Sequence, residues 1–305
     1  MTADVVVVTW RSGERVLRCL ERLRSQEHPH TVWIVDNASG DATVEGVRSR
    51  FPDAQVLELE RNVGFGGAVN AAVAEGAAEA IVLVNDDVEL EAGAVGALVG
   101  PLSDPEVGMV CGMTTLPGQD LVDGFGIELD VTLAAYNRLR RREPGANPGV
   151  LLGPSGGLAA YRRHAFEEVQ GFDTRLFAYG EDVDLALRLR RAGWGAAAAP
   201  GARGVHLGGA SVGFDSPRQR FLAGFARGFL LRRYGVLRGR HVGRALAIEA
   251  MVVAAGIVRG WTLAHVRGRV AGWRAAGRER LEVPPRAVDD RITTREAIRR
   301  LRHAR

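Results

Sequence analysis

Four short apolar runs, each followed by polar residues and then by a segment of helical period, constrain the fold of this chain most strongly. The runs are rich in β-branched residues, and the segments between them carry apolar residues three and four positions apart. Strands that alternate with helices predict an α/β fold: a Rossmann-like, mostly parallel sheet with helices on both faces. We expect strands at 5–9, 31–35, 55–60 and 80–84, and helices at 14–26, 42–51, 67–76 and 92–102.

The rest of the chain predicts more sheet and then a helical extension. Residues 115–149 have no clear period, which indicates an insertion or a loop. Around them the pattern predicts strands at 107–113 and within 151–161, and helices at 163–170, 181–192, 216–234 and 241–273, with a final Arg-rich helix. We therefore expect one domain over 1–215 and a basic C-terminal extension over 216–305.

Composition excludes several classes of protein. With 46% hydrophobic and 25% charged residues, the chain is neither disordered nor a multi-span membrane protein. Two cysteines cannot form a disulfide scaffold, and the N-terminus lacks the features of a signal peptide. The uncharged run 250–258 is too short to cross a bilayer. These features predict a cytoplasmic protein.

Charge is distributed unevenly along the chain. Residues 232–305 hold 18 Arg against 6 acidic residues, whereas residues 1–231 are net acidic. Arg beside Trp261 and Trp273 suits a helix that lies on an anionic membrane surface, which would place the protein at the inner face of the cell membrane. A solvated tail that packs its apolar stripe on the main domain is the alternative. The acidic first part and the absence of a known module argue against nucleic acid as a partner.

Polar clusters follow several predicted strands, and in a parallel sheet such clusters meet at one edge. Thr9 ends the first strand, and Asp36 with Asn37 ends the second. A turn with a helix N-cap is one interpretation of the second cluster. A carboxylate that accepts hydrogen bonds from a base or a ribose is the other, and the two are compatible.

The segment from Asn62 to Gly67 resembles a phosphate-binding turn that precedes a helix. It also half-matches the dinucleotide fingerprint, but Val69 occupies the last glycine position and the segment follows the third strand. A nicotinamide-dependent oxidoreductase therefore remains an alternative function.

Two adjacent carboxylates, Asp86 and Asp87, end the apolar strand 80–84, and their mutual repulsion requires compensation. A divalent cation, Mg²⁺ or Mn²⁺, would supply it. His206 ends a later strand and would complete the metal site if it lies within reach of Asp87. A helix N-cap or a solvated turn is the alternative for the acidic pair.

Glu181 and Asp182 open the helix predicted at 181–192. A carboxylate at a helix N-terminus is stabilised in its charged form and suits a general base toward an alcohol. An N-terminal charge cap is the alternative.

Taken together, the motifs resemble the family 2 glycosyltransferases with the GT-A fold, especially the branch of bacterial rhamnosyltransferases. The resemblance covers about residues 1–211 and rests on VVVVTWRSGERVLRCLERL, IVDNASGD, RNVGFGGAVNAAV, VLVNDDVEL, GPSGGLAAYRRHAFEEVQGFD, FAYGEDVDLALRLRRAGW and ARGVHLGGAS.

The resemblance implies inverting transfer of a sugar from a nucleotide-diphosphate donor, dTDP-rhamnose or a UDP-sugar, with a divalent cation. Asp182 would be the catalytic base, Glu181 would orient the acceptor, and Asp87 with His206 would bind the metal. The residues implied in nucleotide-sugar binding are Thr9, Asp36, Asn37, Gly66, Gly67, Asn70 and Asp86.

Four features depart from the family pattern or bear on the acceptor. The acidic motif is Asn-Asp-Asp, without its first carboxylate, and Trp10-Arg11 replaces the usual aromatic-Asn pair. No Gln-x-x-Arg-Trp motif of processive synthases follows Asp182. The basic tail suggests a glycan or polyprenyl-linked saccharide acceptor in cell-envelope polysaccharide synthesis. A non-catalytic nucleotide-sugar-binding protein remains a further alternative.

Overall fold

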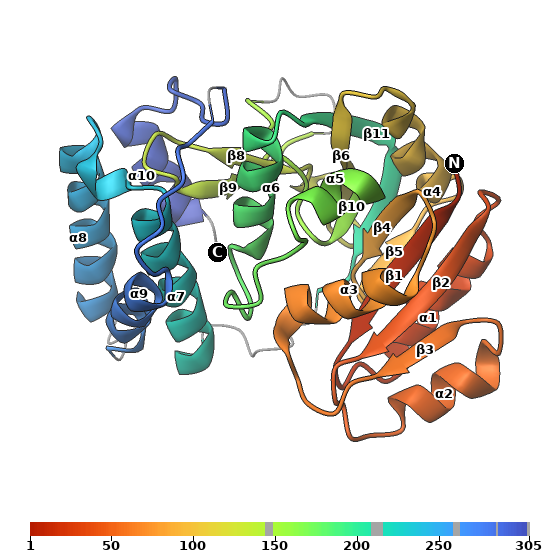
Figure 1. Ribbon diagram of the computed structural model, residues 1–305. Helices are drawn as coiled ribbons and strands as arrows, with labels where there is room; N and C mark the ends of the chain where they lie inside the picture. Colours follow the sequence, from red (N-terminus) through yellow and green to blue (C-terminus); the bar gives the residue numbers. More distant parts are fainter. Residues whose placement is uncertain (144–148, 209–215, 259–262, 285, 304–305) are drawn as a thin grey trace.

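A mixed sheet forms the centre of the computed structural model, which describes residues 1–143, 149–208, 216–258, 263–284 and 286–303 (Figure 1). Within these residues the sheet has nine strands in the order β3-β2-β1-β4-β10-β6-β11-β5, with β7 beside β6. The strands are β1 (Ala3–Thr9), β2 (His30–Asp36), β3 (Gln55–Glu58), β4 (Ala80–Val84), β5 (Val88–Leu90), β6 (Val107–Thr115), β7 (Val122–Gly124), β10 (Leu158–Arg162) and β11 (Gly195–His206).

Strand direction explains where polar residues gather. β1 to β4 pair in parallel, and β6 and β11 run in the same direction as these four. β10 lies antiparallel between β4 and β6, and β5 is antiparallel to β11. The predicted α/β fold is confirmed, and the carboxyl ends of β1, β2, β4 and β11 share one edge of the sheet.

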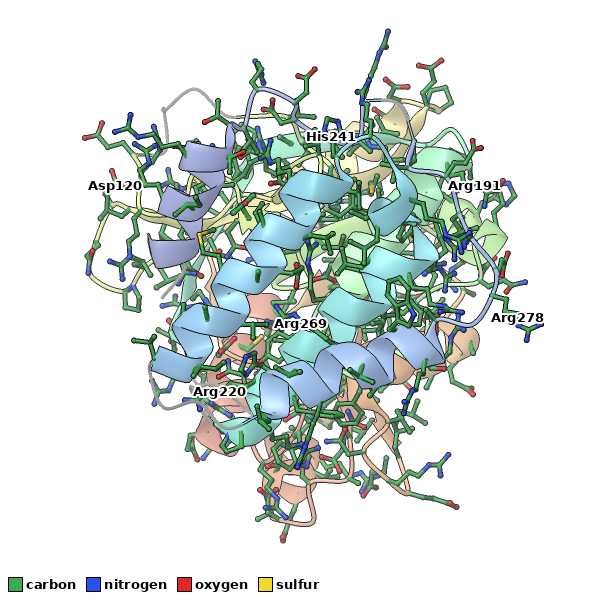
Figure 2. All side chains as sticks on the ribbon, turned by 90° about the vertical axis from the view of Figure 1, so that its left-hand side faces the viewer. Asp120, Arg191, Arg220, His241, Arg269 and Arg278 are labelled. Carbon is green, nitrogen blue, oxygen red and sulfur yellow. The ribbon has the colours of Figure 1, made fainter. Side chains whose placement is uncertain are left out.

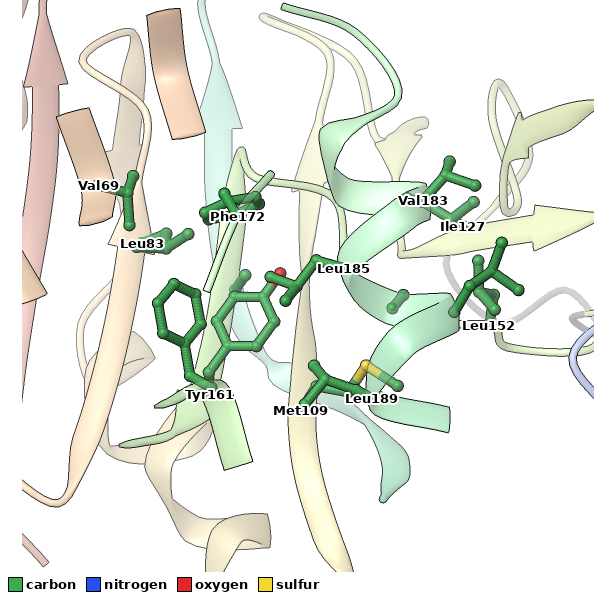
Figure 3. Packing of buried hydrophobic residues seen from close by; sticks show 14 of the residues in the cluster. Val69, Leu83, Met109, Ile127, Leu152, Tyr161, Phe172, Val183, Leu185 and Leu189 are labelled. Atoms are coloured by element: carbon green, nitrogen blue, oxygen red, sulfur yellow. The ribbon is translucent and has the colours of Figure 1, made fainter. Parts of the chain in front are cut away.

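Helices cover both faces of the sheet. α1 (Glu14–Arg24), α2 (Thr43–Arg50) and α4 (Ala94–Val99) contribute to the core on one face. α3 (Gly64–Glu75), α5 (Arg163–Glu168) and α6 (Glu181–Arg191) contribute to the core on the other. Figure 3 shows this second core, in which Tyr161 and Phe172 pack between the sheet and α6. Alternate residues of β1 enter the two cores, as the pleat of a strand requires.

Three stretches differ from the sequence-based expectation. The helix predicted over 241–273 is two helices, α8 (Val242–Val258) and α9 (Ala264–Ala275). Residues 115–149, expected to be irregular, contain β7 and a hairpin of β8 (Ile127–Leu129) and β9 (Ala135–Asn137). β5 is three residues long and was not predicted, because so short a strand has no readable period.

The C-terminal helices pack on the side of the sheet that α6 covers (Figure 1). α7 (Pro217–Arg233) and the segments after it add apolar side chains to that core. The core therefore includes residues on both sides of the predicted domain boundary between 215 and 216. The boundary itself stays a prediction. The chain ends in α10 (Thr294–His303). The residues added from this region are Leu230, Leu231, Tyr234, Val236, Ala245, Leu281 and Ala287.

Glycines bring α7 and α9 into close backbone contact. A Cβ on Gly228 would lie 2.0 Å from the Arg269 carbonyl oxygen, and one on Gly272 would lie 1.9 Å from the Phe225 carbonyl oxygen. Gly224 and Gly268 extend the same contact one turn further. Such Gly-x-x-x-Gly pairs let two helix axes approach more closely than larger side chains allow.

Several arginines of the extension form ion pairs with the acidic first part of the chain. Arg233 Nη1 lies 2.6 Å from Asp173 Oδ2, and Arg244 Nη2 lies 3.0 Å from Asp130 Oδ2. Arg300 Nη1 lies 2.7 Å from Glu128 Oε2. Part of the uneven charge along the sequence is thus neutralised inside the molecule, where the extension contacts the main domain.

Candidate functional site

The carboxyl ends of β1 and β2 bring Thr9 and Asp36 side by side, because the two residues are register partners. Asp36 Oδ2 accepts a hydrogen bond from the Ser39 backbone N–H at 3.1 Å, which forms a turn, but α2 has Ala42 at its N-cap without a side-chain cap hydrogen bond. In the described part of the chain, Asp36 Oδ1 and Thr9 Oγ1 are buried without a hydrogen-bonding partner. Buried polar atoms are usually paired, so these two atoms mark a place for a polar ligand.

Asn37 ties the end of β2 to the glycine-rich turn. Its Oδ1 accepts from the Val63 backbone N–H at 2.8 Å, and its Nδ2 donates to the Gly64 carbonyl oxygen at 3.2 Å. The side-chain amide is therefore engaged within the protein, and α3 begins at Gly64, immediately after this contact. Contact of Asn37 with a nucleotide stays a prediction.

The glycines and the asparagine of α3 face the protein. A Cβ on Gly66 would lie 2.6 Å from Phe172 Cβ, and one on Gly67 would lie 3.0 Å from Val63. Asn70 Oδ1 accepts from the Phe172 N–H at 3.0 Å, and its Nδ2 donates to the Phe172 carbonyl oxygen at 2.9 Å. These contacts account for the residue types by packing, and their predicted roles along the ribose and diphosphate stay predictions.

Asp86 is buried at the end of β4 and accepts a hydrogen bond from the Ser12 hydroxyl. Burial raises its pKa to about 6, the Ser12 hydrogen bond opposes that rise, and the charge of Asp87 adds to it. The charged form of Asp86 is thus disfavoured chiefly by burial, and the repulsion by Asp87 that the sequence indicated makes a smaller contribution.

His206 lies between two carboxylates. Its Nε2 lies 3.3 Å from Asp87 Oδ2, and its Nδ1 lies 2.7 Å from Asp123 Oδ2. Hydrogen bonds with Asp123 and then with Asp87 raise the pKa of His206 to about 10. Asp87 Oδ1 is buried without a hydrogen-bonding partner. Over the described residues, no group of three or more His, Cys, Asp and Glu side chains is arranged to hold a metal ion.

Glu181 and Asp182 form the first turn of α6, as predicted. Asp182 Oδ2 accepts from the Gly156 backbone N–H at 3.0 Å, and its Oδ1 is buried without a partner among the described residues. Burial raises the pKa of Asp182, and burial together with the charge of Asp182 raises that of Glu181. Burial therefore outweighs the stabilisation of the charged form that the helix N-terminus was expected to give. A carboxylate with a raised pKa is a better proton acceptor than an ordinary aspartate.

Backbone hydrogen bonds connect the two halves of the site. The Gly156 N–H donates to Asp182. In the same loop, the Gly157 carbonyl oxygen accepts a hydrogen bond from the Asn85 N–H at 3.1 Å. Asn85 precedes the acidic pair, and the Leu207 N–H donates to the Asp87 carbonyl oxygen at 2.9 Å. Asp87, His206 and Asp182 therefore belong to one connected edge of the sheet rather than to separate faces of the molecule.

Three residues of this edge escaped the sequence interpretation. Ser12 and Gly156 lie within the motifs that carry the family resemblance, but a serine or glycine there has no distinctive signal. Asp123 lies in the stretch without clear period, so only its partner in space identifies it.

Comparisons with known proteins show the family of the chain. The family model described as Glycosyl transferase family 2 matches residues 4–170, more than half of the chain. The chain is 34% identical over 241 residues to the N-acetylglucosaminyl-diphospho-decaprenol L-rhamnosyltransferase of Mycobacterium tuberculosis, covering 69% of this chain and 78% of that protein. It is 26% identical over 199 residues to the O-antigen chain rhamnosyltransferase RfbN of Salmonella typhimurium, covering 64% and 62%.

Solved structures share the fold. The mannosyltransferase PcManGT of Pyrobaculum calidifontis, in complex with GDP-Man and Mn²⁺, aligns with a TM-score of 0.55 at 19% identity, over 90% of this chain and 86% of that one. GalNAc-T7 with UDP, GalNAc and Mn²⁺ aligns with a TM-score of 0.60 at 14% identity, over 77% and 48%. The expected GT-A architecture is confirmed.

These matches decide between the functional classes that the sequence left open. The glycine-rich turn lies inside the matched residues 4–170, and the matched family is one of sugar transferases rather than nicotinamide-dependent oxidoreductases. Relatives named as rhamnosyltransferases cover most of the chain, which also argues against a non-catalytic protein that only binds a nucleotide sugar. The chain therefore belongs to glycosyl transferase family 2 and is a glycosyltransferase.

Proposed function

We propose that this glycosyltransferase moves rhamnose, from a nucleoside-diphosphate donor, to a hydroxyl of a lipid-linked N-acetylglucosamine saccharide in cell-envelope polysaccharide synthesis, with inversion at the anomeric carbon. The observation that carries the proposal is the connected edge on which Asp182 and the pair Asp87–His206 lie. The similarity to a mycobacterial rhamnosyltransferase named for an N-acetylglucosaminyl-diphospho-decaprenol substrate supports the choice of donor and acceptor.

The donor nucleotide binds at the ends of β1 and β2 in this proposal. Thr9 Oγ1 and Asp36 Oδ1, both buried and unpartnered in the described chain, receive the polar groups of the base and ribose. Asn37 holds the turn at Val63 and Gly64 in place beside them. Asp86 contacts the ribose side, while Gly66, Gly67 and Asn70 line the path of the ribose and diphosphate.

The residues of the edge fit a divalent cation, Mn²⁺ or Mg²⁺. Asp87 offers a buried, unpartnered oxygen, and His206 Nε2 lies 3.3 Å from the other oxygen of the same carboxylate. Both ions keep several coordination positions for water and phosphate oxygens, so two protein ligands are sufficient. The chemistry that such an ion supplies when bound is compensation of the charge that develops on the leaving diphosphate.

Asp182 acts as the general base. Its carboxylate takes the proton of the acceptor hydroxyl while that oxygen attacks the anomeric carbon and the bond to the diphosphate oxygen breaks. One displacement of this kind inverts the anomeric configuration. The Gly156 N–H fixes one oxygen of Asp182 and leaves Oδ1 for the acceptor. Glu181, whose raised pKa keeps it protonated over a wider range, donates a hydrogen bond that orients the acceptor.

The acceptor in this proposal is a polyprenyl-diphosphate-linked saccharide, so the enzyme works at the inner face of the cell membrane. Among the helices of the residues described, none has the length and hydrophobicity needed to cross a bilayer. Peripheral association with the membrane is part of the proposal.

The test is a transfer assay with the full chain. A synthetic polyprenyl-diphosphate N-acetylglucosamine is incubated with dTDP-rhamnose or a UDP-sugar, with Mn²⁺ or with EDTA. We expect a product one deoxyhexose heavier with dTDP-rhamnose and Mn²⁺, with an anomeric configuration opposite to that of the donor by NMR, and no product with the UDP-sugar or in EDTA. Donor binding without product would favour the non-catalytic alternative, and retained configuration would contradict direct displacement by Asp182.

A further inference from the structure

The outward face of α8 has no charged residue. Its exposed large side chains are Leu246, Met251, Ile257 and Val258, the last two being 59% and 87% exposed. The exposed alanines of the helix lie between them, at positions 247, 250 and 254. A surface helix ordinarily places its apolar stripe inward and its charges outward, so α8 has the reverse of the usual pattern.

The charged residues of α8 point into the protein instead. Arg244 pairs with Asp130, and Glu249 lies 2.6 Å from Arg227 Nε and 2.7 Å from Arg269 Nε. Arg227 also donates to the Thr132 carbonyl oxygen at 2.9 Å. These contacts fix the rotation of α8 about its axis, so the apolar face is held outward.

The neighbouring helix adds positive charge beside this apolar face. Leu263, Arg267, Val270 and Arg274 are exposed and follow one another at intervals of four, three and four residues, which places them on one side of α9 and its first flanking residue. In Figure 2, α8 and α9 lie in front of α7 and form the surface that faces the viewer. Apolar and cationic side chains thus alternate along α9, next to the uncharged stripe of α8.

We propose that this surface, the α8–α9 outer face, docks on a bilayer that contains anionic lipid. It consists of Leu246, Met251, Ile257, Val258, Leu263, Arg267, Val270 and Arg274. Apolar side chains enter the boundary between head groups and acyl chains, and the arginines pair with anionic head groups. A second copy of the chain is a poorer occupant, because two-fold packing of this face would bring Arg267 and Arg274 close to the same residues of the partner.

The outer face is mechanically connected to the loop that precedes the proposed base. α9 packs backbone to backbone on α7 through the pairs Gly224–Gly228 and Gly268–Gly272. α7 contacts that loop, since Arg218 lies 5.5 Å from the Phe177 ring centroid and a Cβ on Gly180 would lie 2.9 Å from Ala226 Cβ. Docking would therefore hold Asp182 at a fixed position relative to the lipid surface. Only this last consequence rests on the proposed function, because lipid binding needs no sugar transfer.

The experiment is co-sedimentation of the full chain with vesicles of phosphatidylcholine alone or with added phosphatidylglycerol. We expect binding that requires phosphatidylglycerol and weakens with salt. The double variant R267E/R274E and the double variant I257S/V258S should each lower the partition coefficient by at least about tenfold. The matched control is R18E/R24E, which makes the same charge change at exposed positions of α1 and should bind as the unchanged chain does.

Three outcomes of the binding experiments would overturn the proposal. Equal binding to both kinds of vesicle would exclude recognition of anionic lipid, and equal losses in R267E/R274E and R18E/R24E would exclude this surface. Light scattering tests the second copy: a dimer that I257S/V258S converts to a monomer, with vesicle binding unchanged, would assign the face to self-association. Failure of the transfer assay with vesicle binding intact would overturn the proposed function alone.

Discussion

His206 Nδ1 lies 2.7 Å from Asp123 Oδ2, while Nε2 of the same ring faces Asp87. Histidines that ligate metals generally use their second ring nitrogen in this way, and the outer carboxylate fixes the orientation of the ring. Asp123 comes from β7, on a stretch that the sequence pattern does not organise. In the proposed metal site, Asp123 would therefore be a positioning residue that acts through His206.

Replacing Asp123 by Asn should weaken Mn²⁺ binding about 10- to 100-fold, because His206 loses the carboxylate that orients it. The measurement is the free Mn²⁺ signal in electron paramagnetic resonance during a titration of the purified chain. Asp120→Asn is the control, because the side chain of Asp120 is 83% exposed and lies three residues away in the same stretch. Unchanged affinity in D123N would remove Asp123 from the site.

Asp182→Asn should leave donor binding intact and lower sugar transfer by at least about a hundredfold, the usual scale for loss of a general base. The amide can still accept the hydrogen bond from the Gly156 N–H, so the local fold should survive. Donor binding is followed by calorimetry and transfer by mass spectrometry of the product. Turnover equal to that of the unchanged enzyme would refute the assignment of the base.

The pH at which the rate falls on the acidic side should lie well above the ordinary pKa of an aspartate, about 4. Burial raises the pKa of Asp182, and a general base is active only when deprotonated, so activity should fall as the pH drops through that raised value. The measurement is kcat/KM for the acceptor across pH, at saturating Mn²⁺. An unchanged rate down to pH 5 would contradict a base with a raised pKa.

Much of this edge of the sheet could be predicted because its residues end strands. A β-branched run such as 80–84 specifies a buried strand, and the residues directly after such a strand in a parallel sheet must lie at the shared edge. That rule places Asp36 and Asp87 correctly without any coordinates. The same rule places His206 at this edge, because it ends a strand, although more than a hundred residues separate it from Asp87.

The contacts that hold these residues could not be predicted in the same way. Asn70 is predicted to lie along the ribose and diphosphate. Its side-chain amide forms hydrogen bonds with the N–H and the carbonyl oxygen of Phe172. No local sequence pattern specifies a partner so distant along the chain. The break between α8 and α9 was missed for another reason. Apolar residues continue through the predicted helix 241–273, and only packing against α7 shows that the two halves have different directions.

The glycine contact between α7 and α9 gives a prediction for stability. Gly228→Ala should destabilise the protein by about 1–3 kcal/mol, because the new Cβ would lie 2.0 Å from the Arg269 carbonyl oxygen and the helices would have to separate. Gly243→Ala in α8 is the matched control, since nothing lies within 4 Å of its added Cβ. The control should be neutral or stabilising by up to about 1 kcal/mol, as alanine is the better helix former. Chemical denaturation of both variants makes the comparison, and equal stability would show that α7 and α9 do not rely on this close approach.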